Sequence, residues 1–291
     1  MKKGYEIAGH HVALTAPDDW FSGDMLYNYR PFEADPASPA LVSVSAVEDL
    51  GPSDGFREVF LSEEPGFPVF RVLRSETRWR FIVSPLSGEP VCSEFEAEED
   101  FSSARLQLRN PDLLRFAVDN ALMILFALRT ATEGTLEMHA SVVTCEGKGY
   151  LFLGKSGTGK STHSRLWLKN IPGTELLNDD NPVLRVLPDG TVRVYGSPWS
   201  GKTPCYKAQD IPVGAIVRIE QAPFNRITRL PVLNAYASLY PSCSGFRPVR
   251  KVADGLHETL SHIAVNTPCY RLECLPDADA AILCHNTVAH G

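Results

Sequence analysis

The sequence contains no apolar run long enough to cross a membrane. Its most apolar segment, Leu113 to Leu128, is interrupted by Arg115 and Asp119, whereas a membrane-spanning helix needs about 20 consecutive, mostly apolar residues. The first residues, Met-Lys-Lys, are soon followed by Glu6 and lack the apolar stretch that a signal peptide requires. We therefore expect a cytoplasmic protein with no membrane partner.

Basic runs and paired cysteines are also absent. Asp and Glu number 35 against 28 Lys and Arg, which gives a net charge of −7, and an acidic surface repels the phosphates of nucleic acids. The seven cysteines include no C-x-x-C pair, so their spacing favours free thiols in a reducing compartment over a zinc site or a disulfide framework. No nucleic-acid partner is expected.

The residues that are present fit a soluble globular protein with two domains. Apolar residues make up 44% and charged residues 22% of the 291 positions. We expect a β-rich N-terminal domain over residues 1–133, ending in a buried apolar helix, and an α/β domain over residues 134–291. Gly134 marks the expected boundary.

Strand patterns dominate the first domain until a helix ends it. Residues 41–47 alternate apolar and small polar side chains, and residues 69–73 and 79–83 are rich in β-branched and aromatic residues. Asn110-Pro111-Asp112 then has the composition of a helix start. The helix should continue to about Thr130 with apolar residues on nearly all faces, so it should be buried.

The second domain alternates strands and helices, as an α/β fold does. We expect strands over residues 141–144, 150–153, 175–177, 182–187, 215–220 and 270–275. We expect helices over residues 161–169, 232–239 and 254–264, and a last helix that starts at residues 277–279.

A phosphate-binding loop follows the strand over residues 150–153. The segment Gly154-Lys155-Ser156-Gly157-Thr158-Gly159-Lys160-Ser161 matches the pattern G-x-x-x-x-G-K-[ST]. Such glycines let several backbone N–H groups turn toward one point, where phosphate oxygens bind. Lys160 would reach the β- and γ-phosphates of a nucleoside triphosphate, and the Ser161 hydroxyl would bind Mg²⁺. The expected nucleotide contacts are Gly154, Ser156, Gly157, Thr158, Gly159, Lys160, Ser161 and Thr162.

Two adjacent carboxylates, Asp179 and Asp180, come after the next apolar run. Carboxylates soon after a phosphate loop suit the two acidic tasks of phosphoryl transfer, which are holding Mg²⁺ and accepting a proton from the acceptor. The alternative is that Asn178-Asp179-Asp180-Asn181 is a plain turn between two strands, which its composition also favours.

Two further residues are candidates for the same site. His139 precedes the strand that should lie beside the loop-bearing strand, although a lone histidine is more often structural. Lys202 ends the Gly- and Ser-rich segment 196–202. It could neutralise charge on a transferring phosphoryl group, or it could be an exposed lysine in a surface turn.

Taken together, these residues resemble the superfamily that contains HPr kinase/phosphorylase and phosphoenolpyruvate carboxykinase. The resemblance lies in Met138-His139-Ala140-Ser141, in the phosphate loop with Phe152-Leu153 before it and Thr162 after it, and in Asn178-Asp179-Asp180. It covers roughly residues 136–187 and does not extend to the N-terminal domain. It implies a carboxykinase-like P-loop domain with a mixed sheet. It also implies that Asp179 is the catalytic base, that Asp180 is associated with the metal and that His139 lies near the transferred phosphate.

The function that we expect is the Mg-ATP-dependent phosphorylation of a hydroxyl, with a serine of a protein or peptide as the favoured acceptor. The expected catalytic residues are Asp179, His139, Lys160 and Lys202, and the expected metal ligands are Ser161 and Asp180. Alternatives left open are GTP in place of ATP, a carboxykinase-like enzyme acting on a small metabolite, and a nucleotide-dependent switch or assembly protein. A homo-oligomer is compatible with each of them.

Overall fold

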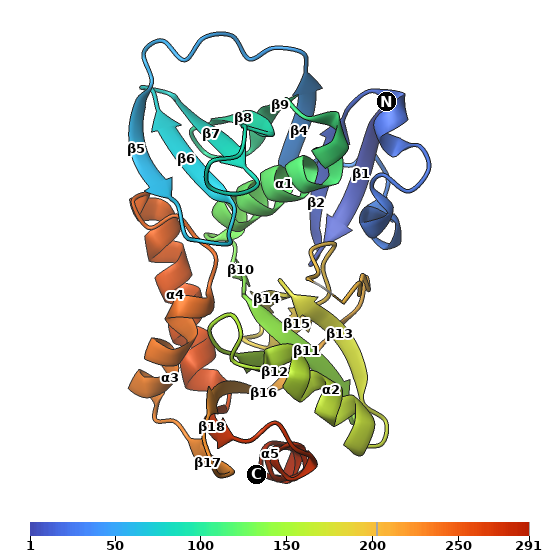
Figure 1. Cartoon of the computed structure of the whole chain (residues 1–291), viewed down its shortest axis with the longest axis vertical. Helices are drawn as coiled ribbons and strands as arrows, with labels where there is room; N and C mark the ends of the chain where they lie inside the picture. Colours follow the sequence, from blue (N-terminus) through green and yellow to red (C-terminus); the bar gives the residue numbers. More distant parts are fainter. Residues whose placement is uncertain (202, 291) are drawn as a thin grey trace. The chain divides into compact units, whose positions relative to one another are not determined.

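The computed structural model describes residues 1–201 and 203–290. The chain divides into two compact units, Met1–Arg129 and Thr130–Gly291. This division falls just before Gly134, where the sequence places the boundary. Each unit is built around a β-sheet of its own (Figure 1).

The first unit is β-rich, as predicted. Its strands follow the order β3-β1-β2-β4-β9-β8-β7-β6-β5; β4 is parallel to its neighbours β2 and β9, and the other pairs are antiparallel. The strands are β1 (Lys2–Ile7), β2 (His10–Thr15), β3 (Glu33–Ala34), β4 (Val42–Val47), β5 (Arg57–Ser62), β6 (Val69–Arg74), β7 (Arg78–Ser84), β8 (Ser93–Glu98) and β9 (Ser103–Leu108). Two 3₁₀ helices, η1 (Asp18–Phe21) and η2 (Tyr27–Phe32), lie between β2 and β3.

A long helix, α1 (Leu114–Thr130), follows the last strand of this sheet. It is preceded by the 3₁₀ turn η3 (Pro111–Leu113), and the Asn110 side chain accepts a hydrogen bond from the backbone N–H of Asp112 (3.1 Å) as a helix cap does. Along α1 only the side chain of Arg115 is exposed. No helix among the described residues is both long and apolar enough to cross a membrane.

The second unit contains a mixed sheet, again as predicted. Its strands follow the order β10-β14-β15-β16-β12-β11-β13, and β18 pairs with β16 and with β17. β12 and β18 run parallel to β16, and the other pairs are antiparallel. The elements are β10 (Thr135–Glu137), β11 (Ala140–Cys145), β12 (Lys148–Leu153), α2 (Lys160–Asn170), β13 (Glu175–Asp180), β14 (Val183–Val186), β15 (Val192–Tyr195), β16 (Asp210–Gln221), β17 (Arg226–Arg229), α3 (Val232–Leu239), η4 (Tyr240–Ser242), α4 (Arg250–Asn266), β18 (Cys269–Cys274) and α5 (Ala278–His290).

Helices cover both faces of this second sheet. Alternation along β12 shows the two faces: Leu151 belongs to a core with Leu260 of α4, whereas Phe152 packs with Trp167 of α2 and Ala281 of α5. The sheet is therefore a middle layer between helices. Because β12, β16 and β18 are parallel, their carboxyl ends meet at one edge, which is the usual place for ligands in α/β folds.

The strand expected over residues 175–177 is longer in the structure. β13 continues through Asp180 and pairs with β11 as far as Ala140. The side-chain amide of Asn178 donates to Ser197 Oγ and to the carbonyl of Trp199 (both 3.2 Å). Residues 178–180 are therefore part of a strand and not the turn that their composition also favours, because pairing with β11 outweighs the local turn preference of Asn and Asp.

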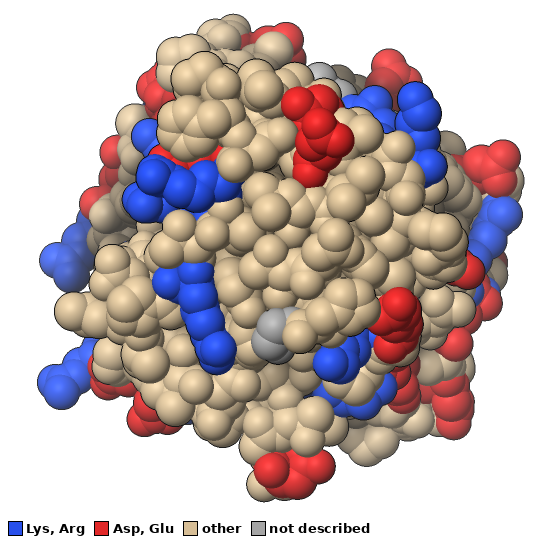
Figure 2. Space-filling model, turned by 90° about the horizontal axis from the view of Figure 1, so that it is seen from below, with Lys and Arg blue, Asp and Glu red and all other residues tan. Residues whose placement is uncertain are grey.

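Charges of both signs are spread over the face of the molecule seen in Figure 2, around a largely uncharged central area. Among the described side chains on this face, Lys and Arg are interspersed with Asp and Glu rather than gathered into one basic field. An extended basic field is the usual mark of a surface that follows a nucleic-acid backbone.

Gly255, inside α4, provides a test of how closely this helix packs. A methyl group at this position would lie 2.4 Å from the carbonyl oxygen of Ala131 and 2.8 Å from its carbonyl carbon. Alanine in an unobstructed helix gains about 0.5–1 kcal/mol over glycine, but overpacking costs about 1–3 kcal/mol. Gly255→Ala should therefore lower the thermal midpoint of unfolding, measured beside the exposed α4 variant Glu258→Ala. An unchanged or higher midpoint would show that the backbone at Ala131 moves aside without cost.

Candidate functional site

The phosphate loop joins β12 to α2, and its shape depends on its glycines. Gly157 and Gly159 have φ angles of 80° and 105°, in the left-handed region that other residues rarely adopt. A Cβ atom at Gly154 would lie 2.3 Å from Oγ1 of Thr158, and this hydroxyl donates to the carbonyl of Lys155 (2.8 Å). The result is a compact turn at a helix N-terminus, where backbone N–H groups without helical partners can bind an anion.

The side chain of Lys160 turns back over this loop. Its Nζ atom donates to the carbonyl of Gly154 (3.0 Å) and lies 2.9 Å from Nε2 of His139. Burial lowers the pKa of the Lys160 ammonium, and the negative charges of Asp180 and Asp179 oppose that change. The cation is therefore held at the loop by two neutral acceptors, which phosphate oxygens could replace.

His139 connects Lys160 to Asp180. Its Nδ1 atom lies 3.0 Å from Oδ1 of Asp180, while its Nε2 atom faces the Lys160 ammonium. An ammonium group can only donate, so Nε2 accepts, and the proton of a neutral ring is then on Nδ1. Hydrogen bonds run from Lys160 to His139 and from His139 to Asp180, and a single tautomer satisfies both.

Asp179 lies next to Asp180 in β13 and is almost fully buried, with 7% of its surface exposed. Its Oδ1 atom has no hydrogen-bond partner among the described residues. Leaving a buried carboxylate oxygen unpaired costs free energy. A ligand that brings a proton or a positive charge to this oxygen would remove the cost.

The residues at this edge of the sheet fit Mg²⁺ by their chemistry. Asp180 and Asp179 supply carboxylate oxygens, and Ser161 supplies a hydroxyl from the first turn of α2. Mg²⁺ prefers hard oxygen ligands of this kind and binds proteins through one or two carboxylates together with substrate phosphates. The unpaired Oδ1 atom of Asp179 is consistent with a missing cation or donor.

A buried carboxyl that the sequence analysis did not identify lies two residues before His139. Glu137 is fully buried; Ser244 Oγ donates to its Oε1 atom (3.2 Å), and its Oε2 atom has no partner in the described part of the chain. Burial raises the pKa of Glu137 to about 8, against the hydrogen bond from Ser244, and the charge of Asp180 adds to the rise. At neutral pH this carboxyl is therefore mostly protonated.

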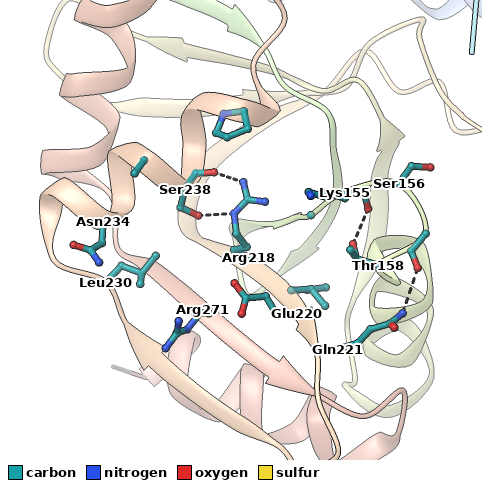
Figure 3. Close-up of a pocket in the computed structure, with 15 residues that line it drawn as sticks. Lys155, Ser156, Thr158, Arg218, Glu220, Gln221, Leu230, Asn234, Ser238 and Arg271 are labelled. Carbon is teal, nitrogen blue, oxygen red and sulfur yellow. Dashed lines mark hydrogen bonds between the residues drawn. The ribbon is translucent and has the colours of Figure 1, made fainter. Parts of the chain in front are cut away.

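Two cavities flank the phosphate loop, and both are lined by Gly157 and Thr158. The larger, of about 800 Å³, lies on the side of β16, β18 and α3 and contains Lys155, Arg218 and Arg271 (Figure 3). The smaller, of about 540 Å³, lies on the side of α2, and its described lining residues include neither Lys nor Arg. The loop thus separates a cationic cavity from an uncharged one.

The structure brings together most of the residues singled out in the sequence. His139 contacts both Lys160 and Asp180, and the charges of Asp179 and Asp180 both act on the Lys160 ammonium. Ser161 belongs to the helix that receives the loop. The last candidate, Lys202, lies outside the described residues.

A separate group of metal-type ligands lies elsewhere in this unit. Ligand atoms of Cys145, Glu146 and His285 are within 4.8 Å of one another. Cys145 and Glu146 stand at the turn between β11 and β12, at the opposite end of β12 from the phosphate loop. This group is therefore not part of the candidate site.

Comparisons with known proteins give limited information. No protein-family model and no curated protein matches the chain. Among solved structures, the Hpr(Ser) kinase/phosphatase from Coxiella burnetii is similar with a TM-score of 0.32 and 13% sequence identity, over 53% of this chain and 88% of that chain. The functional assignment therefore depends on the residues of this chain.

Glu137 makes the stability of the folded protein depend on pH. Its folded pKa of about 8 lies above the ~4.3 of an exposed glutamate, so the folded state keeps a proton that the unfolded chain has released. The stabilisation of the folded state by this proton is complete below about pH 4 and is lost as the pH rises toward 8. Glu137→Gln, which cannot ionise, should gain stability relative to wild type over this range, by at most about 1.4 kcal/mol per pH unit.

Urea unfolding of both proteins between pH 5 and pH 8.5, without nucleotide, measures this difference. The exposed variant Glu133→Gln is the control. A difference that stays constant with pH would mean that Glu137 is already ionised in the folded protein.

Proposed function

We propose that this protein transfers the γ-phosphoryl group of Mg-ATP to a hydroxyl group of an acceptor. The observation that carries the proposal is the chain of contacts from the phosphate-loop lysine to His139 and from His139 to Asp180, next to the buried Asp179, whose Oδ1 atom has no partner among the described residues. A phosphate loop alone only binds a triphosphate, whereas a carboxylate with an unoccupied oxygen supplies the base that transfer needs. GTP is the alternative donor, and the acceptor classes are a serine of a protein or peptide and a small hydroxyl metabolite.

In this proposal the triphosphate lies along the loop, with its oxygens on the backbone N–H groups of the loop and of the start of α2. Lys160 exchanges the carbonyl of Gly154 and the ring of His139 for β- and γ-phosphate oxygens. Ser161 and Asp180 would hold Mg²⁺, which neutralises part of the phosphate charge when bound.

Asp179 accepts the proton of the acceptor hydroxyl. The hydroxyl oxygen attacks the γ-phosphorus, the bond between this phosphorus and the β–γ bridging oxygen breaks, and the products are ADP and a phosphate monoester. Asp179 suits this role because burial fixes its position and its Oδ1 atom is not engaged by any described residue. Positioning of this kind supplies much of the rate gain in phosphoryl transfer.

His139 loses one of its contacts once Lys160 has turned to the phosphates. Its Nδ1 atom stays on Asp180, which keeps the ring oriented. Its Nε2 atom loses the lysine donor and is left close to the transferred group.

Lys160→Ala should weaken the binding of Mg²⁺ and a non-hydrolysable ATP analogue by roughly 10- to 150-fold, the usual effect of losing a hydrogen bond to a charged group. Calorimetric titration measures the affinity. Lys169→Ala, an exposed lysine in the same helix, is the control and should bind like wild type. Wild-type affinity in Lys160→Ala would rule out this loop as the nucleotide site.

The two aspartates should differ in their effects. Asp179→Asn should bind nucleotide almost as wild type does but transfer phosphate about 10²–10⁴-fold more slowly, as expected for a lost general base. Asp180→Asn should lower nucleotide affinity and raise the Mg²⁺ concentration required, because a charged oxygen ligand is lost. ADP formation and nucleotide titration over a range of Mg²⁺ concentrations test both.

Equal binding defects in these variants would assign both carboxylates to the metal. A wild-type ATP turnover that no hydroxyl compound stimulates and that Asp179→Asn does not change would favour a nucleotide-dependent switch over a phosphotransferase.

A further inference from the structure

The larger cavity beside the phosphate loop has an excess of positive charge. Three cationic side chains, Lys155, Arg218 and Arg271, line it together with one carboxylate, Glu220. Figure 3 shows these side chains between the phosphate loop and α3. The proposed phosphoryl transfer assigns no role to the two arginines.

Arg218 and Arg271 are direct neighbours in the sheet. They are register partners in the parallel pair of β16 and β18, so their side chains leave the same face. Like charges opposite each other on adjacent strands destabilise a sheet. Glu273 lies 3.8 Å from Arg271, but this carboxylate is bound more closely by Arg226 (2.7 Å). A bound anion would offset the repulsion between the two arginines.

Arg218 is fixed by hydrogen bonds to neutral groups, and the nearby charge of Glu220 favours its charged form. Its Nε atom donates to Oγ of Ser238 (2.7 Å), and its Nη2 atom donates to the carbonyl of Ser238 and to Oγ of Ser242 (3.0 Å). All of these acceptors are neutral. The Nη1 atom takes part in none of these bonds, and in Figure 3 the guanidinium lies between Ser238 and Lys155. Such a pre-positioned arginine loses little freedom when it binds an anion.

The smaller cavity has the opposite character. Its wall includes Leu166, Pro223 and Leu275, and Gly159 and Thr162 at the start of α2 also line it. A nucleotide with its phosphates on the loop can place its uncharged base there, because this cavity adjoins the loop and has largely apolar walls. The cationic cavity is then available to the second substrate. Gly154 and Lys155 of the phosphate loop line this cavity.

We propose that the larger cavity binds the phosphoryl acceptor, and that this acceptor is a small hydroxyl compound carrying a carboxylate or phosphate group. The proposal rests on the phosphotransferase function proposed above. Arg218 and Arg271 bind the anionic group, for which the planar guanidinium has matching geometry. Asn234 and Ser238, one turn apart on the same face of α3, line the same cavity. Their polar groups can form hydrogen bonds with the rest of the acceptor compound.

The reaction of such an acceptor balances without a further reactant. Its hydroxyl oxygen forms the new bond to the γ-phosphorus, and its proton passes to Asp179. The bond from this phosphorus to the β–γ bridging oxygen breaks, and ADP leaves. The product is the same acid with one phosphate monoester added.

The test compares hydroxyl compounds that differ in an anionic group. The pairs are glycerate and glycerol, glycerol 3-phosphate and glycerol, and serine and serinamide, with the peptide acetyl-Ala-Ser-Ala-amide as a protein-like acceptor. ADP formation and phosphorus NMR of the product are measured for wild type, Arg271→Gln and Arg229→Gln. Arg229 is an exposed arginine of β17 outside the cavity and serves as the matched control.

We expect transfer to the member of at least one pair that carries the carboxylate or phosphate group and not to the partner that lacks it. Arg271→Gln should raise the KM for this compound roughly 10- to 100-fold, the usual effect of losing a charged hydrogen bond. It should leave nucleotide affinity unchanged, and Arg229→Gln should behave as wild type. Arg271→Lys, which keeps the charge, should recover part of the loss.

Binding of the same compounds is measured separately by calorimetry, with Mg²⁺ and a non-hydrolysable ATP analogue already bound. An anionic compound could bind to wild type and much less to Arg271→Gln without receiving phosphate. This result would support the anion subsite and contradict the proposed phosphotransferase function. Several results would overturn the subsite: equal transfer to neutral and anionic compounds, transfer to the peptide alone, or loss of nucleotide binding in Arg271→Gln. Absence of binding and transfer for every compound would overturn it as well.

Discussion

The half-buried ammonium of Lys160 is the charge on which the arrangement of this site depends. It stands at the N-terminus of α2, where the positive end of the helix dipole disfavours a cation, and burial lowers its pKa further. Asp180 and Asp179 oppose both effects from β13, and His139 links the lysine to the first of these carboxylates. Without them the pKa of the lysine would fall further. The two carboxylates therefore help to keep a positive charge at the loop, which the proposed binding of a triphosphate requires.

Backbone pairing sets the distance between the loop and the carboxylates. β11 lies between β12 and β13, and Ser141 pairs with Phe152 on one side and with Asp179 on the other. A slip of one residue in either pair would turn Asp179 to the opposite face of the sheet. The pairing of β11 with β13 shifts register between Val142 and Val143, and such irregularities are frequent beside functional sites. The geometry of the site is thus a property of three strands rather than of the loop alone.

The parts that the sequence predicted well are those where local pattern and tertiary structure agree. The helix expected over residues 232–239 is α3 without change, and the phosphate loop lies between a strand and a helix. The strand expected over residues 175–177 continues through Asp180, which the sequence did not show because turn preference is local and pairing with β11 is not. Glu137 and Arg218 were missed for another reason. Each is a charged residue within an apolar strand, and only the folded structure tells whether such a side chain is buried, paired or directed at a cavity.

The first unit contains a buried charge that is fully paired with other side chains of the chain. Glu96 of β8 accepts from Arg78, Arg80 and Arg105 at 2.7–2.8 Å; burial alone would raise the pKa of Glu96, but these hydrogen bonds lower it. In the second unit, by contrast, the Oδ1 atom of Asp179 has no described partner, and Arg218 has neutral hydrogen-bond partners. The same chain therefore contains complete and incomplete charge pairing. Incomplete pairing lowers stability, and folded proteins tolerate it mainly where a ligand completes it. Part of the free energy of binding nucleotide, metal and acceptor would then come from supplying these missing partners.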